Sequence, residues 1–210
     1  ICIEDGHTVG KPKPIFRKLE NTEIEGFRKI FSGKQDEAKT KNEGEKMEQD
    51  DPAKTESFAK LNLKAAQIKE VKEHPEADKL YIMKIDLGSE TRQLVAGLRP
   101  YYSKEELEGK KIVVVSNLKP AKLRGEMSEG MLLAAEKGKK ITLLCPENSA
   151  PGAQVYIEGI TPGEKQISID DFFKVEISTK DKKAVASGKF LRTDEEDHIN
   201  ADIDDGPKVR

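Results

Sequence analysis

Residues 79–87, KLYIMKIDL, alternate apolar and charged side chains and decide the fold class of this chain. Every second residue from Tyr81 to Leu87 is apolar, and Lys84 and Asp86 lie between them. A period of two places the apolar side chains on one face of an extended segment, as in a β-strand with one buried side. The stretch therefore predicts a half-buried strand.

Similar short apolar runs lie on both sides of this strand, at residues 61–71, 92–96, 111–117, 130–135, 141–144 and 154–157. Several of them are bounded by Gly, Pro, Asn or Ser, which favour turns. Short strands at this spacing predict a small barrel or sandwich. One short helix is expected at residues 102–109, where Ser103 and Glu106 have the spacing of a capping box and Gly109 follows as a stop.

Local differences in apolar and charged content divide the chain into four segments. Residues 1–33 are partly apolar, with a helix expected from about Asn21. Residues 34–57 are highly charged and contain no aromatic or branched aliphatic residue, so we expect a disordered linker. Residues 58–160 hold the strand pattern, and residues 161–210 predict a small β-rich appendage. Its end carries seven acidic residues within 194–205 and is expected to be mobile.

The overall composition excludes several classes of protein. No apolar run approaches the roughly 18 residues of a membrane span. Cys2 and Cys145 are the only cysteines, so a disulfide scaffold is excluded and a cytoplasmic location is expected. The formal charge of −2 argues against nucleic acid until it is counted by segment. Residues 58–160 carry 17 basic against 14 acidic residues, whereas both flanks are acidic.

The most informative loop is SNLKPAKLRGEMSEGMLLAA, residues 116–135, which follows one predicted strand and precedes another. Lys119, Lys122 and Arg124 fall within six residues. Pro120 fixes its backbone φ angle and lacks an N–H, which argues against a continuous helix or strand ladder. A stiffened loop of this kind can hold three cations at the spacing of phosphates.

The same loop contains uncharged candidates for RNA contacts. Asn117 and Ser128 could read a base edge or a sugar hydroxyl, and Met131 could lie beside an unstacked base. In the alternative interpretation, Asn117 is a turn residue, Met131 belongs to the core, and the cations form a solvated surface.

A further set of cations is expected on the barrel face, either to extend the binding surface or to keep a sheet edge soluble. Arg99 precedes two tyrosines, which are expected in the core or at its rim, with base stacking as the alternative. The members of this set are Lys64, Lys69, Lys72 and Arg99.

Residues 58–160 resemble the tRNA-binding domain shared by several synthetase-associated proteins. The matching stretches are FAKLNLKAAQIKEVKEHPEADKLYIMKIDLG (58–88), LVAGL (94–98), the loop 116–135, and PGAQV (151–155). The resemblance implies a five-stranded oligonucleotide/oligosaccharide-binding (OB) barrel, which makes the expected fold mainly β. It implies tRNA contacts by the matching loop residues, which are Asn117, Lys119, Lys122, Arg124, Ser128 and Met131.

Residues 161–210 resemble the C-terminal half of the endothelial monocyte-activating polypeptide group, through TPGEK (161–165) and SGKFLRT (187–193). In that group the extra half covers the barrel and imitates a dimer contact, so the resemblance implies a monomer. It also offers an alternative function as a cytokine-like or interaction module. The group's basic heptapeptide falls at about 64–70, where KAAQIKE lacks the Arg and Gly.

Residues 4–31 resemble the end of the anticodon-binding domain of methionyl-tRNA synthetases, through the pattern G-H-x-x-G followed by P-x-F-x-K-L-E. Together the segments imply a C-terminal fragment of such an enzyme, which would deliver tRNA to attached catalytic and anticodon-binding domains or join other synthetases. No cofactor or metal is expected. The competing hypothesis, that this chain itself aminoacylates tRNA, lacks support because the His-Ile-Gly-His and Lys-Met-Ser-Lys-Ser signatures are absent from the 210 residues.

Overall fold

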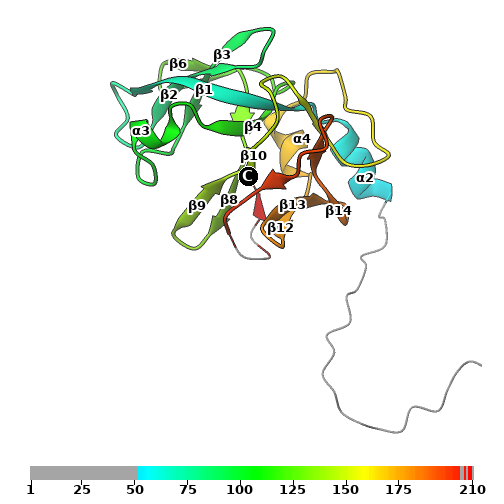
Figure 1. The fold of residues 1–210 in the computed structure, drawn as a ribbon. Helices are drawn as coiled ribbons and strands as arrows, with labels where there is room; N and C mark the ends of the chain where they lie inside the picture. The colour runs from blue at the N-terminus through cyan, green and yellow to red at the C-terminus, as the bar shows by residue number, and fades with distance from the viewer. Residues whose placement is uncertain (1–51, 204–205, 207, 210) are drawn as a thin grey trace, which may run out of the picture. The chain divides into compact units, whose positions relative to one another are not determined.

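The computed structural model describes residues 52–203, 206 and 208–209 (Figure 1). The predicted anticodon-domain remnant 1–33 and the predicted linker up to residue 51 lie outside the described residues. Helix α2 (Pro52–Ala59) occupies the end of that linker, so the prediction of disorder is wrong for residues 52–57. Phe58 explains the difference, because its side chain is buried in a hydrophobic cluster and anchors the helix.

Five strands form a nearly closed barrel, as the sequence predicted. Antiparallel ladders join them in the order β3, β2, β1, β4 and β7, and β3 contacts β7 to complete the circuit. The strands are β1 (Leu63–Glu73), β2 (Tyr81–Asp86), β3 (Thr91–Ala96), β4 (Lys111–Val115) and β7 (Met131–Leu132).

The length of β1 allows it to serve both sides of the barrel. Its first half pairs with β4, from Leu63 opposite Val115 to Gln67 opposite Lys111. Its second half pairs with β2, and the register shifts between Ile68 and Glu70. A bulge of this kind bends a strand and increases its twist, which closes a small barrel.

Short elements connect or border these strands. The predicted capping box is confirmed: Ser103 caps α3 (Lys104–Leu107), and Glu106 reaches back to the Ser103 backbone N–H. No helix in the described part of the chain is long and apolar enough to cross a membrane. The hairpin strands β5 (Ala121–Leu123) and β6 (Glu126–Ser128) form a separate two-stranded ladder, and β11 (Gln154–Tyr156) pairs with β1.

A second sheet combines barrel-segment strands with the C-terminal segment. Its order is β10, β16, β13, β12, β17, β8 and β9, with β14 on β13. In Figure 1 these strands lie beneath the barrel. Their bounds are β8 (Ala134–Lys137), β9 (Lys140–Leu143), β10 (Cys145–Pro146), β12 (Ile177–Lys180), β13 (Lys183–Ala186), β14 (Lys189–Phe190), β16 (Ile199–Asn200) and β17 (Lys208–Val209).

The run KIVVV of β4 is buried on both faces, which explains why it does not alternate. Ile112 and Val114 point into the barrel interior, together with Met83 and Ile85 of β2. Val113 and Val115 belong to the second core, which contains residues of the C-terminal segment such as Phe172 of α4 (Ile169–Phe173).

The C-terminal segment is therefore part of the same compact unit as the barrel, not a separable appendage. Strand β17 pairs with both β12 and β8, and β15 (Arg192–Thr193) extends the barrel sheet by pairing with β11. Residues 194–203 of the acidic end also form part of this unit, contrary to the expected mobility. The Asp197 carboxylate accepts hydrogen bonds from the backbone N–H groups of Asn148 and Ser149, at 2.7 and 3.2 Å.

Candidate nucleic-acid interface

The predicted loop 116–135 contains a projecting hairpin rather than an unstructured loop. Strands β5 and β6 pair from Ala121 opposite Ser128 to Leu123 opposite Glu126, so a two-residue turn joins them. Arg124 and Gly125 form this turn with φ angles of 51° and 97°. Two positive φ angles are typical of the turns that match the twist of a tight hairpin. The loop contains no continuous helix or long strand, in agreement with the prediction from Pro120, but it does contain this short ladder, which Pro120 precedes.

Three exposed cations belong to this hairpin and its approach: Lys119, Lys122 and Arg124. None of the three forms an ion pair with another residue in the part of the chain that the structure describes. Every residue of β5 is exposed, and the apolar side chains of Leu123 and Met127 are 40% and 46% exposed. The hairpin thus presents cations without ion-pair partners among the described residues, together with apolar surface.

Asn117 fixes the base of the hairpin instead of facing RNA. Its side chain is 8% exposed, and its amide Nδ2 donates to the carbonyl oxygens of Lys60 and Lys165, both at 2.8 Å. Its Oδ1 accepts a hydrogen bond from the Asn62 N–H at 3.0 Å. The expectation that Asn117 reads a base edge is therefore corrected, since both polar ends of its side chain already have partners within the protein.

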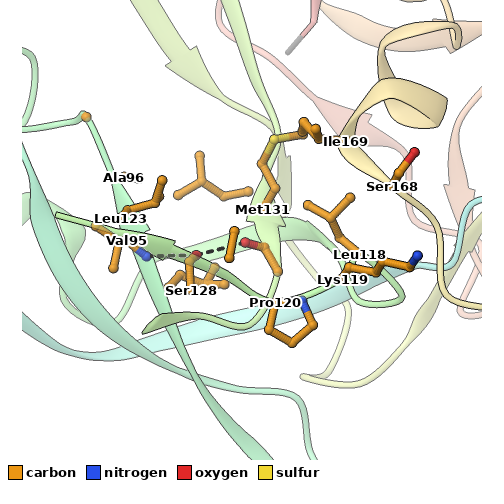
Figure 2. Close-up of a pocket in the computed structure, with 15 residues that line it drawn as sticks. Val95, Ala96, Leu118, Lys119, Pro120, Leu123, Ser128, Met131, Ser168 and Ile169 are labelled. Atoms are coloured by element: carbon orange, nitrogen blue, oxygen red, sulfur yellow. Dashed lines mark hydrogen bonds between the residues drawn. The ribbon is translucent and has the colours of Figure 1, made fainter. Parts of the chain in front are cut away.

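Ser128 has a similar internal role. It is 4% exposed, and its hydroxyl accepts from the Val95 N–H at 3.1 Å while donating to the Gly130 carbonyl at 3.0 Å (Figure 2). Nearby, the Glu129 N–H donates to the Gln93 carbonyl at 2.8 Å. These bonds attach the hairpin to β3. They also correct the expectation that Ser128 contacts a sugar or base.

A groove of about 630 Å³ lies between the hairpin, β3 and the start of α4. Its walls are largely apolar, and the half-buried Met131 extends across it in the direction of Ile169 in the view of Figure 2. Lys119 lines one end. Of the predicted uncharged candidates, Met131 therefore lies where an apolar contact with a ligand is available, although part of its side chain packs against the core.

The other predicted cations differ from those of the hairpin because carboxylates accompany most of them. The Nζ of Lys69 lies 3.4 Å from Asp86, and that of Lys72 lies 2.7 Å from Glu70. Arg99 lies 2.9 Å from Glu73. Lys64 is half-buried on β1, beside β4 and β11. These four cations therefore contribute less positive electrostatic potential than their number suggests, because carboxylates offset most of their charge.

Neighbouring cations lower the pKa of two of these carboxyl groups, Glu70 and Glu73. Hydrogen bonds from Lys72 and Lys84 lower the pKa of Glu70 to about 2. A hydrogen bond from Lys104 and the charge of Arg99 lower the pKa of Glu73 below its usual value. The barrel face is therefore internally neutralised at neutral pH, whereas the hairpin is not.

A prediction concerns the anchor of the hairpin. Asn117→Ala removes four side-chain hydrogen bonds and leaves part-buried backbone groups without these partners, which is expected to lower the free energy of unfolding by about 3 kcal/mol. The melting temperature should then fall by roughly 6–12 °C, as thermal unfolding followed by circular dichroism would show.

The matched control is Asn148→Ala, because Asn148 is exposed and its side chain makes one hydrogen bond, to Asp197. We expect its melting temperature to change by less than about 3 °C. Equal melting temperatures for Asn117→Ala and the unsubstituted chain would contradict the anchoring role.

Comparison with known proteins agrees with this geometry. Residues 63–154 match the family model described as "Putative tRNA binding domain". The methionine–tRNA ligase of Pyrococcus horikoshii is 53% identical over 114 residues, which is 54% of this chain and 16% of that protein. The methionine–tRNA ligase of Archaeoglobus fulgidus is 40% identical over 154 residues, 73% of this chain and 23% of that protein.

The crystal structure of the C-terminal domain of Plasmodium vivax p43 superposes with a TM-score of 0.68 at 28% identity, covering 73% of this chain and 98% of that one. The shared fold thus extends beyond the matched family segment. The chain itself spans less than a quarter of the curated relatives it matches. Residues 63–154 form a tRNA-binding domain related to methionyl-tRNA synthetases.

Proposed function

We propose that the chain binds tRNA through the β5–β6 hairpin and delivers it to, or retains it for, an attached methionyl-tRNA synthetase. The observation that carries this proposal is the exposed trio Lys119, Lys122 and Arg124, which lacks carboxylate partners among the described residues. Lysine and arginine side chains neutralise phosphates, and a contact of this kind positions a protein on nucleic acid without reading its sequence.

The remaining candidates have secondary roles in this proposal. Met131 offers an apolar contact beside the cations. On the barrel face, Lys64, Lys69, Lys72 and Arg99 can approach RNA where a phosphate replaces a carboxylate as their partner. Exposed ion pairs are worth little, so such an exchange of partners is inexpensive.

The proposed role is that of a binding module, not a catalytic one. Tethering tRNA beside an attached enzyme raises its effective concentration at the active site without any new catalytic group. We further propose that the module works as a monomer in the cytoplasm, because the C-terminal segment covers one face of the barrel that would otherwise expose apolar residues.

The salt dependence of tRNA binding tests the mode of contact. Three phosphate contacts predict a slope of roughly −2 to −3 for log affinity against log salt, and hence about a 20- to 60-fold loss between 50 and 200 mM. Fluorescence anisotropy with labelled tRNA measures this slope. Affinity that does not change with salt would contradict binding through phosphates.

The delivery role has its own measurement. In the synthetase that carries this chain, deletion of residues 52–210 alone is expected to raise the KM for tRNA several-fold while kcat at saturating tRNA stays unchanged. The reason is that tethering supplies binding and leaves the chemical step alone. An unchanged KM would show that the module binds tRNA without assisting aminoacylation.

A further inference from the structure

A second group of cations lies on the β8–β9 turn, in a part of the chain that the loop motif does not include. Lys137, Lys139 and Lys140 occur within four residues around Gly138. Lys110 and Lys182 join them at two neighbouring hollows of about 650 and 270 Å³. The signal was present in the sequence as KGKK, but only the fold places it beside lysines from other segments.

An exposed aromatic side chain lies in the same place. Tyr101 is 43% exposed and lines the larger hollow together with Lys110, Lys139 and Lys140. The neighbouring Tyr102 holds this segment against β9, because its hydroxyl donates to the Ile141 carbonyl at 3.0 Å. We call Tyr101, Lys110, Lys139, Lys140 and Lys182 the Tyr101 surface.

The positive charge of this surface has little internal compensation. Among the described residues, the one carboxylate that lines either hollow is that of Asp202. It lies 3.8 Å from the Nζ of Lys140 and 3.4 Å from that of Lys182, and its side chain is 79% exposed. Lys137 and Lys139 form no ion pair with any residue that the structure describes.

We propose that the Tyr101 surface is a second RNA contact, in which an unpaired base stacks on Tyr101 and the flanking phosphates bind Lys110, Lys139 and Lys140. The proposal rests on the proposed tRNA-binding function and adds a contact separate from the hairpin. Aromatic side chains beside cations are the arrangement that binds single-stranded nucleic acid, because each base has a face that can stack and each phosphate has a charge to neutralise.

Asp202 has a specific part in this arrangement. Its carboxylate occupies the position of an anion between Lys140 and Lys182, so an RNA phosphate that binds there must displace it or be repelled by it. The acidic side chain therefore weakens RNA binding. An increase in RNA affinity on removal of this carboxylate would distinguish the proposal from a purely structural role of Asp202, since loss of a structural ion pair would not strengthen RNA binding.

The test uses fluorescence anisotropy with unfractionated tRNA at one salt concentration and a set of variants of the chain. Asp202→Asn is expected to raise affinity about threefold or more, because removal of one exposed negative charge favours a neighbouring phosphate. The fold is retained, since the Asp202 main-chain carbonyl that accepts from Lys140 Nζ at 2.7 Å is present in both forms.

The variants of the lysines and of Tyr101 lower affinity. The double change Lys139→Glu with Lys140→Glu is expected to reduce it at least about tenfold. Tyr101→Ala is expected to reduce it about fivefold or more, whereas Tyr101→Phe keeps the stacking face and stays within about twofold of the unsubstituted chain. The charge-matched control, Lys54→Glu with Lys174→Glu, changes two exposed lysines that line neither hollow and should have less than about a threefold effect.

The outcomes separate this proposal from the proposed function. If the hairpin cations are needed for binding but the Asp202, Tyr101 and lysine variants all match the unsubstituted chain, the Tyr101 surface is not an RNA contact and the proposed function stands. The Tyr101 surface is likewise excluded as an RNA contact if it binds an acidic protein while substitutions in it leave tRNA affinity unchanged. If the unsubstituted chain binds no tRNA, both proposals are overturned.

Discussion

Changing Lys119, Lys122 and Arg124 together to glutamate is expected to lower tRNA affinity at least about a hundredfold. Each substitution removes a cation that can neutralise a phosphate and adds a negative charge that repels it. The three side chains lie on one projecting hairpin, so their effects act on the same stretch of RNA. The loss should shrink at high salt, because the attractive and repulsive contributions are both screened.

The barrel should stay folded in this variant. All three side chains are exposed, and none has an ion-pair partner among the described residues whose loss would leave a buried charge. Arg124 has a positive φ angle of 51°, a strain that glutamate shares. Anisotropy reports the binding, and thermal unfolding reports the fold.

The control for net charge is the triple change of Lys54, Lys174 and Lys189 to glutamate, which alters the formal charge equally at sites that line neither the groove beside the hairpin nor the hollows of the Tyr101 surface. We expect it to weaken binding by less than about fivefold, because distant exposed charges are screened. Equal losses in the two triple variants would mean that overall charge, and not the hairpin, drives binding. An unaffected hairpin variant would exclude the hairpin as the site.

The strands were predictable because their signal is local. The alternation in residues 81–87 reproduces the burial pattern of β2, and the apolar run of β4 reflects a strand with two buried faces. The sequence does not predict in the same way which residues cover the second buried face of β4. It is covered by residues more than 50 positions away, such as Phe172, which no local pattern connects to β4.

The residues of the candidate site show the same difference between what local sequence predicts and what depends on distant residues. The positions of Lys119, Lys122 and Arg124 on one exposed element follow from their spacing. The role of Asn117 depends on Lys60, Asn62 and Lys165, which no local sequence pattern places beside it. Likewise, the charge of Arg99, in the turn after β3, is offset by Glu73 at the end of β1, which no local sequence pattern places beside it.

One missed element had a readable signal. The apolar character of residues 167–177 favours a β-rich region, yet α4 begins within them. Ser168 caps the helix, and the Asp171 carboxylate reaches back to the Ser168 N–H and hydroxyl. This reciprocal pattern is a capping box, the feature that correctly predicted α3. The apolar residues of α4, which are Ile169, Phe172 and Phe173, have the i, i+3, i+4 spacing of a helix, but the element is too short for this spacing to outweigh the β-rich character of the surrounding segment.

Removal of residues 161–210 is the second change with a large expected effect. The C-terminal segment contributes Phe172, Val175, Ile177 and Leu191 to the core that covers Val113 and Val115 of β4. Without it, this apolar face of the barrel is exposed to water, and the edges of β8, β10 and β11 lose their partner strands. Exposed apolar faces and open strand edges favour association.

We therefore expect residues 52–160 alone to form dimers or larger assemblies, and the full chain to be a monomer. Size-exclusion chromatography with light scattering distinguishes the two. A milder variant keeps the chain intact: Phe172→Ala leaves a cavity beneath α4 and should lower the free energy of unfolding by about 3–5 kcal/mol. Its control, Phe173→Ala, changes a side chain that is 55% exposed and should cost less than about 1 kcal/mol. A truncated chain that remained a monomer with an unchanged melting temperature would show that the barrel core suffices by itself, because the covering segment would then contribute nothing to its stability.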